Sequence, residues 1–120
     1  MAEATSALDS LGFAELRFAN VARCEKAFHP LASWSPSDWA MATAGELGEL
    51  CNLLKKARRG EAVDPLALAD EAADVVIYLD LLCARIGIDL GAAVRRKFNI
   101  VSDRRKCDIK LPEVSENFPP

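Results

Sequence analysis

Two pairs of acidic residues are the part of this sequence best suited to chemistry. Glu46 and Glu49 form the first pair, and Glu71 and Asp74 form the second. Within each pair the carboxylates are three residues apart, which on a helix places them on one face, one turn apart. On a helical wheel Glu46 falls inside an apolar arc with Glu49 at its edge, and the second pair lies beside apolar residues. Because buried acids are rare unless they are paired or bind a metal, these positions indicate a site.

The same residues predict a bound cation if their two helices pack antiparallel. Four carboxylates would then converge in one partly dry cleft, where they either take up protons or bind cations. Oxygen ligands on rigid helices suit a hard divalent ion, Mg²⁺ first and Mn²⁺ as a substitute. The alternative is that Glu49 and Asp74 are solvated and that nearby lysines pair with Glu46 and Glu71.

Composition limits the classes of function. The chain has 120 residues, of which 51% are hydrophobic, and its mean hydropathy is +0.05, as in a soluble globular domain. No apolar run reaches membrane-spanning length, so no membrane partner is expected. The net charge of −3 argues against nucleic-acid binding through overall charge. The basic residues nevertheless occur in local clusters, which is compatible with a small polyanionic ligand.

The cysteines and the first residues predict a cytoplasmic protein. The four cysteines are scattered, with no C-x-x-C spacing, so neither a disulfide framework nor a zinc site is expected. Two of them, Cys51 and Cys83, occupy apolar helix positions and are interpreted as small core residues. The first ten residues lack the charged start and apolar segment of a signal peptide.

Capping signals divide the chain into four predicted helices and no strands. Serine or aspartate caps precede helices at Ser35, Asp64 and Asp89, and glycines end two of them at Gly60 and Gly87. The expected helices span about 10–28, 35–59, 64–86 and 89–106. We therefore predict an all-α four-helix bundle over residues 1–106, followed by an arm or tail over 107–120. The third helix is apolar nearly all round, which predicts burial against a second copy in a homodimer or homotetramer.

Several linked motifs resemble the MazG-like all-α nucleoside triphosphate pyrophosphohydrolases. The E-x-x-E and E-x-x-D pairs carry the resemblance, and it extends through residues 34–39, 51–56, 77–82, 87–90 and 97–99. It covers roughly 33–105, most of the chain. The resemblance implies Mg²⁺-dependent hydrolysis of a (deoxy)nucleoside triphosphate to the monophosphate and pyrophosphate, with helical bundles assembled as oligomers. It also implies that Glu46, Glu49, Glu71 and Asp74 are the metal ligands.

Candidate catalytic and phosphate-binding residues follow from this reading. Glu49, at the edge of its stripe, is the choice for orienting or deprotonating the attacking water. Lys56 shares the face of Glu49 two turns on, and Lys97 is expected to point inward from the fourth helix. Arg104 follows Lys97 along the same stripe. Asn99 matches the K-F-N run of the family, although its position equally fits a structural contact.

Aromatic residues are the candidates for stacking on a nucleobase. Tyr78 shares the face of Glu71 and is the best placed, whereas Trp39 fits the core better. The set also includes Trp34, Phe28 and His29, the last of which equally fits a surface histidine. Asn20 and Arg23 could enter the site from the first helix, outside the resemblance.

Two alternatives remain open from the sequence. A phosphoribosyl-ATP pyrophosphohydrolase would share the fold and the metal chemistry. A non-catalytic helical bundle with an interaction or regulatory role would keep the four acids only as structure. Pyrophosphate release from a nucleotide panel, with and without Mg²⁺, separates these readings.

Overall fold

The computed structural model describes residues 8–113, and this range is all-helical. Four α-helices follow one another: α1 (Phe13–Arg23), α2 (Pro36–Arg58), α3 (Pro65–Arg85) and α4 (Leu90–Arg104). A π-helical segment, η1 (Cys24–Phe28), continues α1, and a short 3₁₀ turn, η2 (Leu31–Ser33), precedes α2. No strand occurs between residues 8 and 113. The predicted helical class and the approximate helix boundaries are confirmed.

Helices α2, α3 and α4 begin at the predicted caps. Ser35 and Asp38 form a capping box, in which the Asp38 amide donates to the Ser35 hydroxyl and the Ser35 amide donates to the Asp38 carboxylate. Asp64 and Asp89 likewise accept hydrogen bonds from backbone amides at the starts of α3 and α4. Gly60, with a φ of 87°, lies just beyond the end of α2, where a side chain would be strained.

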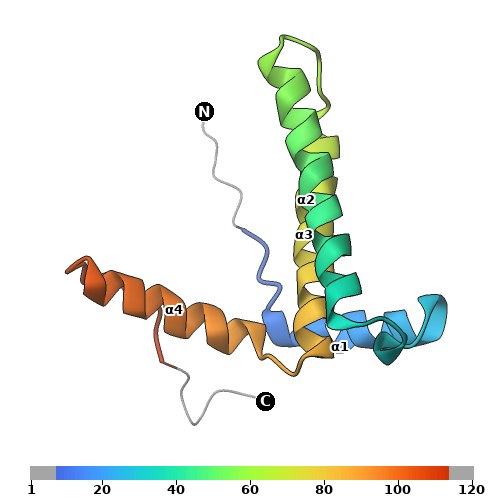
Figure 1. Cartoon of the computed structure of the whole chain (residues 1–120). Coiled ribbons are helices and arrows are strands. Elements are labelled where there is room, and N and C mark those ends of the chain that lie inside the picture. The colour runs from blue at the N-terminus through green and yellow to red at the C-terminus, as the bar shows by residue number, and fades with distance from the viewer. Residues whose placement is uncertain (1–7, 114–120) are drawn as a thin grey trace.

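The arrangement is a helical hairpin with α1 across its base (Figure 1). Helices α2 and α3 run side by side in opposite directions, and α1 packs against α3 at the end away from the hairpin loop. Helix α4 leads away from that base as a separate limb (Figure 1). The four helices therefore do not surround one common core within the chain, and the bundle remains a prediction for an assembled form.

The core of the described residues is small and lies where α1, α2 and α3 meet. Four apolar side chains are buried in this part of the chain: Cys24, Trp39, Leu81 and Cys83. The prediction that Trp39 belongs to the core is confirmed, because it is 2% exposed and its indole nitrogen donates to the Leu31 carbonyl. The prediction for Cys51 is wrong. Its thiol is exposed among the described residues, so its apolar position on the helix did not lead to burial.

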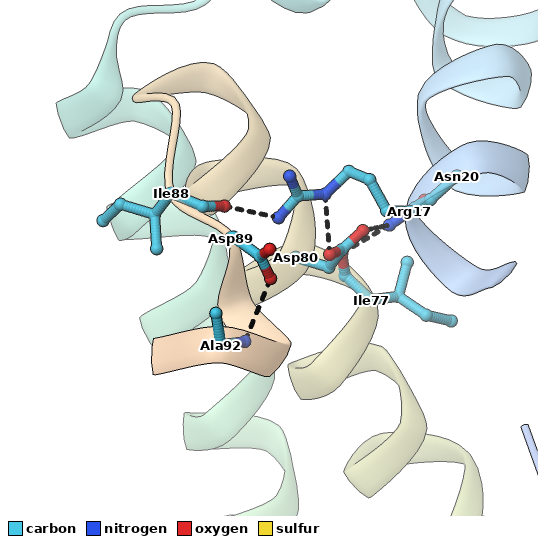
Figure 2. A network of polar contacts seen from close by, with 7 residues as sticks. All are labelled: Arg17, Asn20, Ile77, Asp80, Ile88, Asp89 and Ala92. Atoms are coloured by element: carbon cyan, nitrogen blue, oxygen red, sulfur yellow. Dashed lines mark hydrogen bonds and ion pairs between the residues drawn. The ribbon is translucent and has the colours of Figure 1, made fainter. Parts of the chain in front are cut away.

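A buried polar network holds α1 to α3 (Figure 2). The Asp80 carboxylate is 1% exposed and accepts from Arg17 Nε at 2.9 Å and from Asn20 Nδ2 at 3.1 Å. Arg17 also donates to the Ile88 carbonyl after the end of α3, and Asn20 donates to the Ile77 carbonyl. A buried carboxylate is tolerated when it is paired and hydrogen-bonded in this way. The network therefore fixes how α1 lies on α3.

The first residues of the predicted arm fold back along α4. The Asn99 amide exchanges two hydrogen bonds with the backbone of Leu111, and Lys110 forms an ion pair with Asp103. Residues 107–113 contain no helix, and residues 114–120 of the predicted arm lie outside the described range. Among residues 8–113, no helix has both the length and the apolar composition needed to cross a membrane.

Candidate metal and nucleotide site

Three of the four predicted metal ligands lie together between α2 and α3. Glu46, Glu49 and Glu71 each offer one carboxylate oxygen, and these oxygens all lie within 4.8 Å of one another. Glu46 and Glu71 are partly buried, whereas Glu49 is exposed. They meet because α2 and α3 pack antiparallel, which places the acids of α2 opposite Glu71 of α3. Asp74 is partly buried one turn from Glu71 and is not part of this three-oxygen group.

Burial and crowding of negative charge shift the pKa of two of these acids. Burial, followed by the charges of Asp74 and Glu49, raises the pKa of Glu46 above its usual value. Burial, followed by the charges of the three other acids, raises the pKa of Glu71. The effect of Asp74 on both groups shows that its carboxylate belongs to the same electrostatic cluster. We call these four residues the acid cluster.

The donor set of the acid cluster fits a hard divalent cation. Glu71 Oε2 is buried and has no hydrogen-bond partner within residues 8–113, although such an atom is normally satisfied. The described part of the chain contains no ion pair between a lysine or arginine and the acid cluster. The alternative in which lysines neutralise Glu46 and Glu71 is therefore not what the geometry shows. Carboxylate oxygens are the ligands that Mg²⁺ and Mn²⁺ prefer.

An aromatic pocket adjoins the acid cluster at the base of the hairpin. Its volume is about 210 Å³, and α1, η1, the η2 connector, α2 and α3 all contribute to its walls. Asp74 lines this pocket while its charge acts on Glu46 and Glu71, so the pocket and the acid cluster are neighbours. The lining residues are Asn20, Arg23, Cys24, Phe28, His29, Trp34, Trp39, Asp74, Ile77, Tyr78 and Leu81.

Four rings form a connected cluster of tilted pairs along the pocket. The ring centroids of His29 and Trp34 are 4.5 Å apart, those of Trp34 and Trp39 are 4.6 Å apart, and those of Trp39 and Tyr78 are 6.3 Å apart. The His29 ring is held by Ser33, whose hydroxyl lies 3.0 Å from Nδ1. Trp39 is buried, whereas the partly exposed rings of His29, Trp34 and Tyr78 can offer apolar faces to a planar ligand. The structure thus places the predicted stacking residues Trp34, His29 and Tyr78 in one pocket.

The predicted phosphate-binding bases are not gathered at this site within one chain. Lys56 is exposed near the end of α2, and Lys97 and Arg104 are exposed on α4. The expectation that Lys97 points inward is wrong for the single chain, because α4 extends away from the hairpin (Figure 1). Asn99 binds the backbone of Leu111 through both ends of its amide, so its observed contact is structural.

Sequence reasoning missed the means by which the first helix closes the pocket. The π-helical turn at 24–28 directs Cys24 inward, and its thiol donates to the His29 carbonyl at 3.2 Å. Such turns often occur at functional sites, but no residue pattern in this segment announces one. Asp80 was the available signal for the contact between α1 and α3, since it is the one acid within the apolar run of α3.

Comparison with known proteins finds a partial sequence match. The sequence is similar to dCTP pyrophosphatase 1 of Homo sapiens, with 36% identity over 87 residues that cover 67% of this chain and 50% of the human protein. The chain therefore spans about half the length of this curated relative. No protein-family model matches the sequence.

Proposed function

We propose that this protein is a MazG-like, Mg²⁺-dependent pyrophosphohydrolase that converts a (deoxy)nucleoside triphosphate to its monophosphate and pyrophosphate. The observation that carries the proposal is the acid cluster, in which three carboxylate oxygens lie within 4.8 Å and one buried oxygen of Glu71 has no partner in residues 8–113. The aromatic pocket beside it supplies a surface for the base. The similarity to dCTP pyrophosphatase 1 supports the same reaction class.

The division of labour follows from the positions of the residues. Glu46, Glu49, Glu71 and Asp74 would hold the cation, which when bound neutralises charge on the phosphates and makes a bound water more acidic. Glu49, the exposed member of the three-oxygen group, orients the attacking water and accepts its proton. Water adds to phosphorus as the anhydride oxygen leaves, which splits the bond between the α and β phosphates.

Self-association would complete the phosphate site. Val94, Phe98 and Val101 form one exposed stripe on α4, with side chains 39%, 44% and 39% exposed. A second copy that covers this stripe would also bring Lys97 and Arg104 into the interface, where they can approach phosphates held by the acid cluster. Burial of this stripe and of the exposed apolar residues of the hairpin would enlarge a core that is small in the single chain.

The decisive experiment measures pyrophosphate release from a nucleotide panel with and without Mg²⁺. The panel contains the common ribo- and deoxyribonucleoside triphosphates together with phosphoribosyl-ATP. We expect turnover only with the divalent ion, and a loss of at least about a hundredfold in kcat in Glu71→Gln. The matched control is Asp70→Asn, which neutralises the exposed neighbouring acid on α3 and should leave turnover unchanged. Unchanged turnover in a folded Glu71→Gln variant would show that the acid cluster is only structural.

A further inference from the structure

Asn20 is a buried side chain of the aromatic pocket, and its amide is engaged at one end only. It is 4% exposed, and its Nδ2 donates to the Ile77 carbonyl at 2.9 Å and to Asp80 Oδ2 at 3.1 Å (Figure 2). A backbone carbonyl can only accept, and the Asp80 carboxylate, which is paired with Arg17, also only accepts. The amide nitrogen must therefore face α3. The reverse orientation would set the amide oxygen against two acceptors.

The amide oxygen of Asn20 is consequently the end left for a ligand. No hydrogen bond to Oδ1 is formed within residues 8–113, where both hydrogen bonds of the Asn20 side chain come from Nδ2. Asn20 lines the aromatic pocket, which is the cavity a ligand of this amide would occupy. Its two nitrogen bonds fix the orientation of the Asn20 amide, and the residue lines the pocket that holds the aromatic rings.

We propose that Asn20 Oδ1 is a specificity-determining acceptor that binds the exocyclic amino group of a nucleobase. This inference rests on the proposed function and adds to it the class of base. A keto base would place its carbonyl oxygen against Oδ1, and neither oxygen would gain a partner. The ring N–H of a keto pyrimidine is flanked by two carbonyl oxygens, and these would face a wall that also carries the Asp74 carboxylate. An amino group, in contrast, can donate hydrogen bonds to these acceptor oxygens.

Matched substrates test the contact without changing the protein. The pairs dCTP with dUTP and dATP with dITP exchange an amino group for a carbonyl at one ring position. We expect kcat/KM of the full chain with Mg²⁺ to favour the amino member of the better pair by at least about tenfold, because a site built around a hydrogen bond rejects an analogue that cannot form it. Equal kcat/KM within both pairs, with turnover present, would overturn this inference alone.

Binding of dCMP and dUMP without Mg²⁺, measured by calorimetry, reads the same contact without catalysis. A preference for dCMP supports the acceptor role even if no triphosphate is hydrolysed, in which case only the proposed function fails. In Asn20→Ala the preference should fall to near unity in both assays. Retention of the preference in Asn20→Ala would overturn the inference.

The control variant Arg17→Lys distinguishes loss of the Asn20 acceptor from loosened packing of α1 on α3. Arg17→Lys keeps a positive charge near Asp80 but removes the fork of donors that also reaches the Ile88 carbonyl. Thermal unfolding of Arg17→Lys should show lowered stability, whereas its amino-to-keto preference should match that of the unsubstituted protein. An equal loss of preference in Arg17→Lys and Asn20→Ala would show that the amino-to-keto preference depends on how α1 packs on α3. That result would overturn the role of the Asn20 oxygen. If Asn20→Ala fails to fold, the substrate pairs still decide the matter.

Discussion

Replacement of Arg17 by leucine tests whether the buried network holds α1 in place. Arg17 donates to Asp80 at 2.9 Å and to the Ile88 carbonyl at 2.9 Å, and Asp80 is 1% exposed. The charged hydrogen bond contributes about 2 kcal/mol and the bond to the carbonyl about 1 kcal/mol. Asp80 would keep only its bond from Asn20. We therefore expect Arg17→Leu to lower the free energy of unfolding by about 3 kcal/mol, near the range for breaking a buried ion pair.

Chemical denaturation followed by circular dichroism, at one fixed protein concentration, measures this loss. The matched control is Arg96→Leu, which removes an exposed arginine of α4 with no ion pair in the described residues and should change stability by less than about 0.5 kcal/mol. The double variant Arg17→Leu/Asp80→Leu should be less destabilised than the sum of its single variants, because no unpaired charge remains buried. An Arg17→Leu variant as stable as Arg96→Leu would refute the reasoning.

Three further outcomes are expected. The raised pKa values of Glu46 and Glu71 mean that the folded state holds these protons more tightly than the unfolded state, so the metal-free protein should lose stability as pH rises from the ordinary carboxylate range through the raised values. Calorimetric scans should accordingly show a larger rise of Tm with Mg²⁺ at pH 7.5 than at pH 5. Trp34→Ala should raise KM by about tenfold with a smaller change in kcat, whereas Phe18→Ala, which removes an 82% exposed ring of α1, should change neither in steady-state assays. Phe98→Glu should shift sedimentation toward the single chain by placing a charge in the exposed stripe of α4.

The local signals in the sequence predicted most of the fold and part of the candidate site. Caps at Ser35, Asp64 and Asp89 act within a few residues, so their effect is readable without tertiary information. The spacing of the acid pairs predicted their common faces for the same reason. The convergence of Glu46, Glu49 and Glu71 needed only one added assumption, antiparallel packing of consecutive helices, which a short loop favours.

Features that depend on contacts between distant segments could not be predicted from the sequence. Lys97 and Arg104 share a stripe with apolar residues, which predicts burial, but α4 extends away from the hairpin and both side chains are exposed among the described residues (Figure 1). Cys51 was misplaced for the same reason, since helical periodicity identifies an apolar face without saying whether a neighbour exists. The π-helical turn before His29 and the two hydrogen bonds between Asn99 and Leu111 depend on tertiary packing. Neither has a recognisable pattern in the sequence.

The acid cluster and the aromatic pocket are built from different helices, so a substitution can weaken one and leave the other intact. The acid cluster is built from residues of α2 and α3 alone, whereas the pocket takes one wall from α1 and η1. Loosening α1 with Arg17→Leu should therefore raise KM for nucleotides while leaving Mg²⁺ binding, measured by calorimetry without nucleotide, unchanged. Equal weakening of both would mean that α1 also orders the hairpin. In that case Asp74, which both lines the pocket and acts on the acid cluster, would be the residue through which the two are coupled.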